Sequence, residues 1–164
     1  MTGMAPSLAD SALVDLAADN ADAVTRCLPV LRVLRPHLGP DEAIAAQLAR
    51  QARQGYRLLA VVAADGAVLA LAGWRFQENT VYGRFLYVDD LVTLPDRRGD
   101  GLGERLIQAL ADEGRAAGCT RLVLDTGITN SAAQRFYYRQ RLAIGALRFS
   151  MMLGPTAPTK GEVT

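Results

Sequence analysis

The chain has 164 residues, of which half are apolar and 21% are charged, so it can build the core of one compact domain and is too apolar for a disordered chain. Its 18 basic and 17 acidic residues leave a formal net charge of +1, which argues against a strong electrostatic grip on nucleic acid or on an anionic membrane. The sequence shows no apolar run near the roughly 18 residues of a membrane helix and no basic, apolar signal peptide at its start. We therefore expect a cytoplasmic protein without a nucleic-acid or membrane partner.

The cysteines and the histidine give no sign of a metal site. Cys27 and Cys119 lie far apart and lack metal-ligand spacing. The single histidine, His37, falls in an expected loop and offers no evident partner for a catalytic thiol. Two free thiols are typical of a reducing compartment. We expect neither a metal ion nor cysteine chemistry.

The N-terminal third is expected to hold one strand and two helices. Residues 11–17 read as a short strand. Asn20 or Asp22 can cap a helix whose apolar residues recur every three or four positions as far as Leu34. Residues 40–54 begin with proline followed by two acidic residues and predict a second helix.

The middle of the chain changes to a period of two. Residues 56–64 and 68–76 predict two strands around an Asp-Gly turn at 65–66. Residues 77–80 are interpreted as a further turn, and residues 85–94 as a third long strand that ends before a proline.

The C-terminal half is expected to continue as helix, strand, helix and strand, over residues 101–117, 121–125, 131–141 and 144–153. An antiparallel meander followed by a crossover unit predicts an α+β fold, with a mixed, mostly antiparallel central sheet flanked by helices. We expect a single domain over residues 1–154 and a polar tail over residues 155–164.

The most informative segment joins the long strand to the helix after it. Residues 94–103 read Leu-Pro-Asp-Arg-Arg-Gly-Asp-Gly-Leu-Gly. The glycines expose backbone N–H groups and the helix dipole adds positive potential, so the turn can hold a phosphate or pyrophosphate. The dinucleotide fingerprint fails because Leu106 stands where its third glycine belongs, and the P-loop lysine is missing. The alternative is a tight turn whose glycines serve geometry alone.

Three segments together resemble one family. The pattern Arg98-x-x-Gly101-x-Gly103 is similar to the acetyl-CoA signature Q/R-x-x-G-x-G/A of the GNAT family of N-acetyltransferases. Residues 130–137, Asn-Ser-Ala-Ala-Gln-Arg-Phe-Tyr, match the N-x-x-A-x-x-F-Y helix of that family, and residues 87–93 resemble its acidic fourth strand. The resemblance covers about residues 56–153. It implies the GNAT fold, acetyl-CoA as co-substrate, and transfer of the acetyl group to an amine of a small molecule or peptide.

The resemblance also implies site residues. Asp89 is the expected general base, acting through a water, and Asp90 is the second choice. Adjacent strand residues point to opposite faces, so only one of the two carboxylates is expected to face the cleft. The alternative is that both carboxylates only form ion pairs or attract a cation. Tyr137 is the expected general acid, with a packed aromatic as the alternative role and Tyr138 as its neighbour. The residues expected to bind acetyl-CoA are Leu91, Val92, Thr93, Arg98, Gly99, Asp100, Gly101, Leu102, Gly103, Asn130, Ala133 and Phe136.

Several points stay open at the level of sequence. Arg141 and Leu142 stand where the family commonly has a glycine and an aromatic, which leaves the end of the last helix and the acceptor pocket undefined. A non-catalytic acyl-CoA-binding module is the alternative function, and the presence of both Asp89 and Tyr137 favours the enzyme. The loops 34–41 and 77–84 are candidate acceptor loops, but they do not identify the amine. The oligomeric state is open, with a homodimer as one option.

Overall fold

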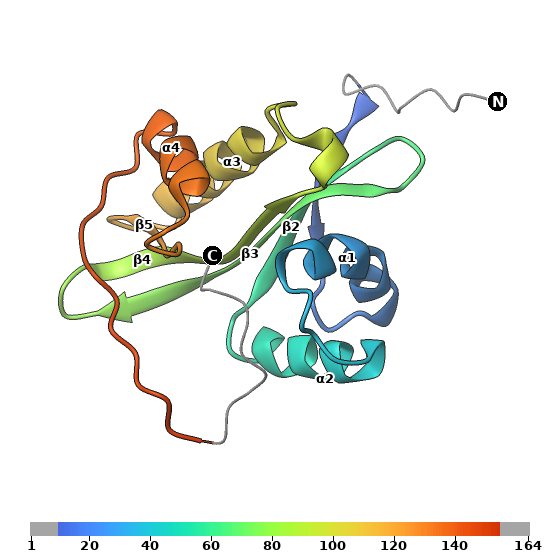
Figure 1. Ribbon diagram of the computed structural model, residues 1–164, viewed down its shortest axis with the longest axis horizontal. Coiled ribbons are helices and arrows are strands. Elements are labelled where there is room, and N and C mark those ends of the chain that lie inside the picture. Colours follow the sequence, from blue (N-terminus) through green and yellow to red (C-terminus); the bar gives the residue numbers. More distant parts are fainter. Residues whose placement is uncertain (1–9, 155–164) are drawn as a thin grey trace.

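Residues 10–154, which the computed structural model describes, fold around one sheet with helices on both of its faces (Figure 1). The elements in chain order are β1 Ala12–Leu16, α1 Ala21–Leu34, α2 Asp41–Ala52, β2 Arg57–Val62, β3 Val68–Asn79, β4 Gly83–Thr93, η2 Pro95–Arg97, α3 Leu102–Ala116, β5 Leu122–Leu124 and α4 Ser131–Arg139. The five strands lie in the order β1-β2-β3-β4-β5. Neighbours from β1 to β4 pair antiparallel and β5 pairs parallel with β4, so the predicted mixed, mostly antiparallel sheet is confirmed.

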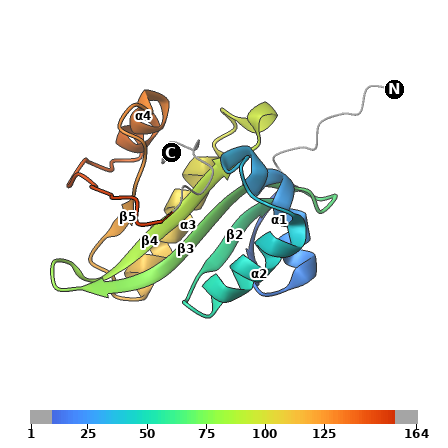
Figure 2. The same cartoon turned by 60° about the horizontal axis from the view of Figure 1, so that its bottom comes forward.

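Two apolar cores hold the helices on the sheet. Helices α1 and α2 cover one face and α3 covers the other (Figure 2). Because strand side chains alternate, Leu58 and Ala60 of β2 enter the first core while Leu59 and Val61 enter the second. Burial on both faces explains why this strand reads as a continuous apolar run rather than an alternating one.

Strand β4 carries a bulge at the carboxylate pair. Gly73 of β3 lies opposite Asp90, and the next residue, Trp74, lies opposite Val88, so Asp89 is the extra residue of β4. Val88 packs in the α3 core, whereas Val92 packs in the α1–α2 core. An unbroken alternation would put both valines on one face, so the bulge changes the parity of the strand. The expectation that Asp89 and Asp90 point to opposite faces is therefore wrong.

The β3–β4 hairpin is longer than expected. Residues 77–79 were expected in a turn but pair with residues 83–85 as strand. The Asn79 side chain accepts hydrogen bonds from the backbone N–H groups of Val81 and Tyr82, at 3.0 and 2.8 Å, and closes the turn. An Asx turn of this kind moves the reversal toward residue 80.

The end of the described chain departs most from expectation. A last strand was expected over residues 144–153, but residues 142–153 are neither helix nor strand. Their alternating apolar pattern is real, yet the segment makes no ladder with a sheet edge within the described residues, so its large side chains lie in solvent. The expected polar tail, residues 155–164, lies outside the described residues. Within residues 10–154, no helix has the length and apolarity needed to cross a membrane.

Candidate functional site

The larger cavity opens where β4 and β5 separate. The two strands pair only over Leu86–Val88 and Leu122–Leu124. Beyond Val88 they diverge and leave a cavity of about 650 Å³ between β4, the turn before α3 and the start of α4. The bulge at Asp89 lies where the pairing stops, which is consistent with its increasing the local twist of the strand.

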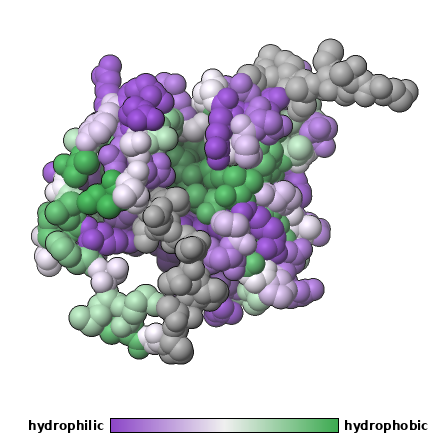
Figure 3. All heavy atoms as spheres, in the orientation of Figure 1, coloured by the Kyte–Doolittle hydropathy of each residue, from purple (hydrophilic) through white to green (hydrophobic). Residues whose placement is uncertain are grey.

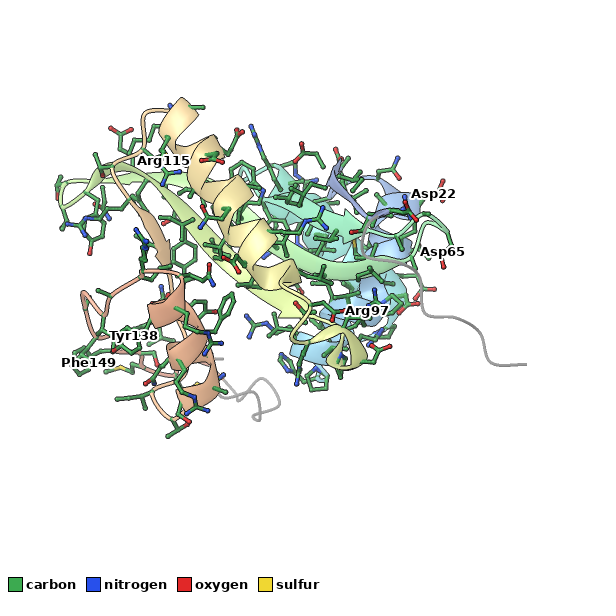
Figure 4. The ribbon with its side chains drawn as sticks, turned by 90° about the horizontal axis from the view of Figure 1, so that it is seen from above. Asp22, Asp65, Arg97, Arg115, Tyr138 and Phe149 are labelled. Carbon is green, nitrogen blue, oxygen red and sulfur yellow. The ribbon has the colours of Figure 1, made fainter. Side chains whose placement is uncertain are left out.

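All but one of the residues expected to bind acetyl-CoA line this cavity. They are Leu91, Val92, Thr93, Arg98, Gly99, Gly101, Leu102, Gly103, Asn130, Ala133 and Phe136. The exception is Asp100, whose carboxylate instead forms an ion pair with Arg97 at 3.3 Å. The Arg97 side chain is only 7% exposed and lies beside the start of α3 (Figure 4). The ion pair joins two residues of the turn before α3 and so stabilises that turn.

The turn before α3 presents backbone N–H groups to the cavity. Gly99 and Gly101 have φ of +90° and +77°, a left-handed conformation that favours glycine. Gly101 is the N-cap of α3, and no side chain of the described residues caps the helix there. The first N–H groups of a helix need a partner, and together with the helix dipole they favour an anion. The glycine-rich turn therefore has the geometry of a pyrophosphate site.

The open edge of β4 offers further backbone groups. The N–H of Leu94 donates to the Leu69 carbonyl of β3 at 3.0 Å. In an antiparallel ladder the bonding side alternates, so the peptide groups of Leu91 and Thr93 face the open side, where β5 no longer pairs. The Thr126 hydroxyl, in the same cavity wall, is buried and has no hydrogen-bond partner within the described part of the chain. These groups fit a long polar arm such as pantetheine.

A smaller cavity lies between β4 and the first two helices. Its volume is about 280 Å³, and its lining includes both carboxylates, Asp89 and Asp90. The loop 34–41, an expected acceptor loop, supplies Arg35, His37 and Leu38 to its wall. Of the described residues, none in 77–84 lines either cavity, so the second expected acceptor loop lies elsewhere. Asp89 alone among the described residues lines both cavities.

Asp89 is held by Arg75. The Arg75 Nε and Nη2 donate to the two carboxylate oxygens of Asp89 at 2.8 and 3.1 Å, a bidentate pair. Burial raises the pKa of Asp89 above its ordinary value and outweighs the opposing effect of Arg75. A carboxylate has about four acceptor positions, so the two hydrogen bonds from Arg75 leave two acceptor positions for a water or an amine.

Asp90 has a different environment. It accepts a hydrogen bond from the Tyr56 hydroxyl at 2.8 Å and pairs with Arg35 at 3.2 Å. Burial and the neighbouring Asp90 charge raise the pKa of Tyr56 well above its ordinary value, so its hydroxyl stays a donor. A Cβ on Gly73 would lie 2.0 Å from the Tyr56 Oη, so only glycine lets the ring reach Asp90. The Tyr56 hydroxyl and the Arg35 guanidinium therefore hold the Asp90 carboxylate in a structural role.

Tyr137 lies on α4 and lines the larger cavity. Its ring packs edge-on against Phe136 at a centroid distance of 5.4 Å. Burial raises the pKa of Tyr137, so its phenol is protonated at neutral pH and can donate. Tyr138 is 53% exposed and lines neither described cavity, which distinguishes the two neighbours. Asn130 accepts from the Ala133 N–H at 3.1 Å as the cap of α4 and also faces the cavity.

Sequence reasoning missed the side chains that hold the two carboxylates. The only available signal was the rule that carboxylates among apolar strand residues need partners. Arg75, Tyr56 and Arg35 lie 14, 34 and 55 positions away from the carboxylates they contact, so spacing could not identify them. Within residues 10–154, no group of three His, Cys, Asp or Glu side chains could hold a metal, and the expected absence of a metal stays a prediction.

Residues 22–141 match the model of the Acetyltransferase (GNAT) family, which is most of the chain. Together with the splayed β4–β5 pair and the glycine turn before α3, this match shows that the chain belongs to the GNAT acetyltransferase family.

The chain is 34% identical over 90 residues to glucosamine 6-phosphate N-acetyltransferase 1 of Oryza sativa subsp. japonica, a match covering 52% of this chain and 54% of the relative. It is 30% identical over 95 residues to aminoglycoside N(6')-acetyltransferase type 1 of Klebsiella aerogenes, covering 56% of this chain and 60% of the relative. The chain thus spans little more than half the length of these relatives.

The fold is shared with solved acetyltransferases. The structure of AAC(6')-Iy in complex with the bisubstrate analog CoA-S-monomethyl-acetylneamine is similar with a TM-score of 0.74 and 18% identity, over 88% of this chain and 99% of that chain. This likeness shows the GNAT fold.

Proposed function

We propose that this chain is an acetyl-CoA-dependent N-acetyltransferase that acetylates an amine of a small molecule. The observation that carries the proposal is the position of Asp89, whose carboxylate borders both the larger cavity and the smaller one. A residue that borders both cavities is within reach of both reactants. Two matched relatives are named for glucosamine 6-phosphate and for aminoglycosides, which favours a small molecule over a peptide as the acceptor.

The larger cavity is the proposed acetyl-CoA site. Acetyl-CoA, when bound, supplies the acetyl group as a thioester. The backbone of the turn at Arg98, Gly99, Gly101 and Gly103 would bind the pyrophosphate, and the peptide groups of β4 would bind the pantetheine arm as a further strand does. The remaining predicted contacts, from Leu102, Asn130, Ala133 and Phe136, would border the arm. Asp100 is left out of this set because it pairs with Arg97.

The smaller cavity is the proposed acceptor site. An amine like that of lysine has a pKa of about 10.4 and arrives as an ammonium ion. The carboxylates attract that cation, and Asp89 accepts its proton, directly or through a water, at an acceptor position that Arg75 leaves free. Tyr137 donates a proton to the departing thiolate on the other side of β4. Asp90 keeps the wall in place through Tyr56.

We also propose the domain extent, the location, the partners and the assembly of the protein. Residues 1–154 would form one catalytic domain. The cytoplasm is the proposed location, because Cys27 and Cys119 are both free thiols in the structure. A net charge of +1 favours a chain without a nucleic-acid or membrane partner. The proposed assembly is a homodimer.

The test is an acetyl-transfer assay on the full chain. Purified protein is given acetyl-CoA and a panel of amino sugars, aminoglycosides, aminoalkylphosphonates, polyamines and lysine peptides. Thiol release is followed with time, and the acetylated amine is identified by mass spectrometry. We expect amine-dependent thiol release with at least one small molecule. Tight CoA binding without thiol release for any amine would favour the non-catalytic binding module.

A further inference from the structure

The smaller cavity, proposed above as the acceptor site, has an apolar floor. Leu31 of α1 and Ile44 and Leu48 of α2 line it and are each between 3 and 5% exposed. The outer surface over α2 is mostly hydrophilic (Figure 3), so the apolar side chains of this helix face the cavity and the core. A polar ligand atom placed on such a floor would lose its hydrogen bonds to water without replacement. The floor therefore favours the hydrocarbon part of a ligand.

One face of α2 forms a wall of this cavity. The residues that the helix contributes are three and four positions apart, which places them on the same side of it: Ile44, Gln47, Leu48 and Gln51. Ile44 and Leu48 are buried. Gln47 is exposed and Gln51 is half-buried, so the two side-chain amides lie toward the mouth of the cavity. The α2 wall is thus apolar at depth, and polar but uncharged near solvent.

The charges around this cavity are balanced. Asp89 and Asp90 are the only acidic residues among the described residues that line it. The Asp89 carboxylate pairs with Arg75 at 2.8 Å. The Asp90 carboxylate pairs with Arg35 at 3.2 Å. Two carboxylates and two guanidinium groups sum to zero, and His37 in the lining could add only positive charge. The acceptor positions left on Asp89 can hold one ammonium, but the described lining offers no excess of negative charge for a polycation.

The size of the cavity limits the acceptor. Its volume of about 280 Å³ equals that of on the order of ten water molecules at about 30 Å³ each. A molecule of on the order of ten non-hydrogen atoms fills such a space, whereas a three-ring amino sugar would leave most of its rings outside. The Arg35 guanidinium, which could bind the carboxylate or phosphate of an anionic amine, is already paired with Asp90. Size and charge therefore both favour a small amine with one charged group.

We propose that the acceptor is a small primary monoamine with a hydrocarbon body. Its ammonium end would meet Asp89, and its chain would lie on the floor formed by Leu31, Ile44 and Leu48. A second ammonium on the same chain would lie against this aliphatic floor, where burying a charge without a partner is costly. The inference rests on the proposed acetyl transfer and narrows its acceptor from any small amine to this one class.

The first test compares acceptors in the wild type. At saturating acetyl-CoA, kcat/KM is measured for primary alkylamines from propylamine to octylamine, for hexamethylenediamine, for an aminoglycoside and for an amino acid. Each added methylene should raise kcat/KM roughly fourfold until the cavity is full. Hexylamine should exceed hexamethylenediamine about tenfold or more, since only the diamine carries a second ammonium. A flat alkylamine series, or a preference for any of the other three acceptors, would overturn this inference and leave the acetyl transfer itself intact.

The second test asks whether the α2 wall makes this choice. Gln51→Glu adds a carboxylate to the lining and should raise kcat/KM for hexamethylenediamine, relative to that for hexylamine, about threefold or more. Gln54→Glu is the matched control, because Gln54 is exposed, follows α2 and lines neither described cavity. Its ratio of diamine to monoamine should stay as in the wild type. An unchanged ratio in folded Gln51→Glu, or an equal rise in Gln54→Glu, would show that this wall does not select the acceptor, and the proposal would fail.

A binding experiment separates a failure of recognition from a failure of catalysis. Isoleucine methyl NMR spectra of the full chain with CoA are recorded while hexylamine or hexamethylenediamine is added. Hexylamine should shift the Ile44 methyl signal and leave that of Ile107 in place, because Ile107 is 2% exposed on α3 and lines neither described cavity. The diamine should shift Ile44 only at about tenfold higher concentration. Ile44 shifts without acetylation of any amine would count against the proposed function and in favour of monoamine recognition, whereas an Ile44 signal that does not respond to hexylamine would overturn the inference.

Discussion

At the scale of single residues, the two neighbouring carboxylates of β4 differ by what engages them. The Asp90 carboxylate accepts a hydrogen bond from Tyr56 and pairs with Arg35. Among the described residues, the Asp89 carboxylate accepts hydrogen bonds from Arg75 alone, and Asp89 borders both cavities. The bulge brings both to the same cavity, which strand alternation alone would forbid. A base and a structural carboxylate can therefore lie side by side.

The contact between Tyr56 and Gly73 gives a test of the structural role of Asp90. Gly73→Ala would put a methyl group into the Tyr56 hydroxyl, displace the ring and break its hydrogen bond to Asp90. We expect the free energy of unfolding to fall by about 1–3 kcal/mol, as for overpacking elsewhere. Urea unfolding measures the change.

Two further variants make this result specific. Gly39→Ala is the control, because its new Cβ would meet its nearest described neighbour at an ordinary 3.9 Å, and it should change stability little. In a Tyr56→Ala background, Gly73→Ala should cost clearly less than in wild type, since the clashing ring is gone. Equal costs in the two backgrounds would show that Tyr56 and Gly73 are not coupled.

Tyr137 is the residue on which the proposed proton donation depends. Tyr137→Phe keeps the ring that packs against Phe136 and removes only the hydroxyl. We expect kcat to fall by about 10²-fold or more while CoA affinity changes little. Steady-state kinetics and calorimetry with CoA separate the two effects. Full turnover would make Tyr137 a packing residue.

The sequence predicted many of these residues but not their partners. The two short motifs and the acidic strand located Asp89, Asp90, Tyr137 and most of the residues lining the larger cavity, because these lie at characteristic local spacings. Nothing in the local sequence shows that the Arg97 side chain turns inward to pair with Asp100. Side-chain partners distant along the chain depend on packing that a single sequence does not display.

At the scale of elements, the turn before α3 combines glycines of positive φ with a helix N-terminus. Gly101→Asp would place a carboxylate where the pyrophosphate is proposed to bind. Gly118→Asp is a matched control at the other end of α3: both glycines have positive φ, +77° and +73°, and in both a new Cβ meets no described atom within 4 Å. The two variants thus carry similar backbone strain and the same charge.

We expect Gly101→Asp to lose CoA binding by 10-fold or more, about 1.4 kcal/mol in binding free energy, and Gly118→Asp to bind as wild type does. Calorimetry with CoA measures both, and melting temperatures show that the two proteins are folded. Unchanged CoA affinity in folded Gly101→Asp would remove the turn from the binding site.

Most elements were predictable from sequence, and the failures have physical causes. Helices α1 to α4 and the strands of the meander follow from caps, turn residues and period, with ends that differ by a few residues. The hairpin turn was placed too early because Gln77, Glu78 and Asn79 are polar residues that nonetheless pair as strand. The last strand failed because a period of two predicts the tendency to pair, whereas pairing also needs an edge within reach.

At the scale of the whole molecule, the sheet separates two cavities and β4 is the wall between them. The family match, the shared fold and the open edge of β4 agree on the GNAT class. We propose that acetyl-CoA binds on the β5–α4 side and the amine on the α1–α2 side, with Asp89 between the two sites. The position of Asp89 between the two proposed sites is the central claim.

The pH dependence of acetyl transfer tests this claim most directly. In the wild type, Asp89 must be ionised to accept a proton, and its raised pKa means that activity falls, as the pH is lowered, at a higher pH than an ordinary aspartate would give. In Asp89→Asn this base is gone, so kcat should be low at neutral pH and rise with pH as free amine accumulates. Asp90→Asn should keep the wild-type profile and lose stability.

The decisive measurement is therefore kcat against pH for the wild type, Asp89→Asn and Asp90→Asn, with one accepted amine held at saturation. The account predicts a fall of about 10²-fold or more at neutral pH for Asp89→Asn alone, with the remaining activity increasing toward alkaline pH. A folded Asp89→Asn that matches the wild type in kcat at every pH, or an Asp90→Asn that shows the base-loss profile instead, would contradict it.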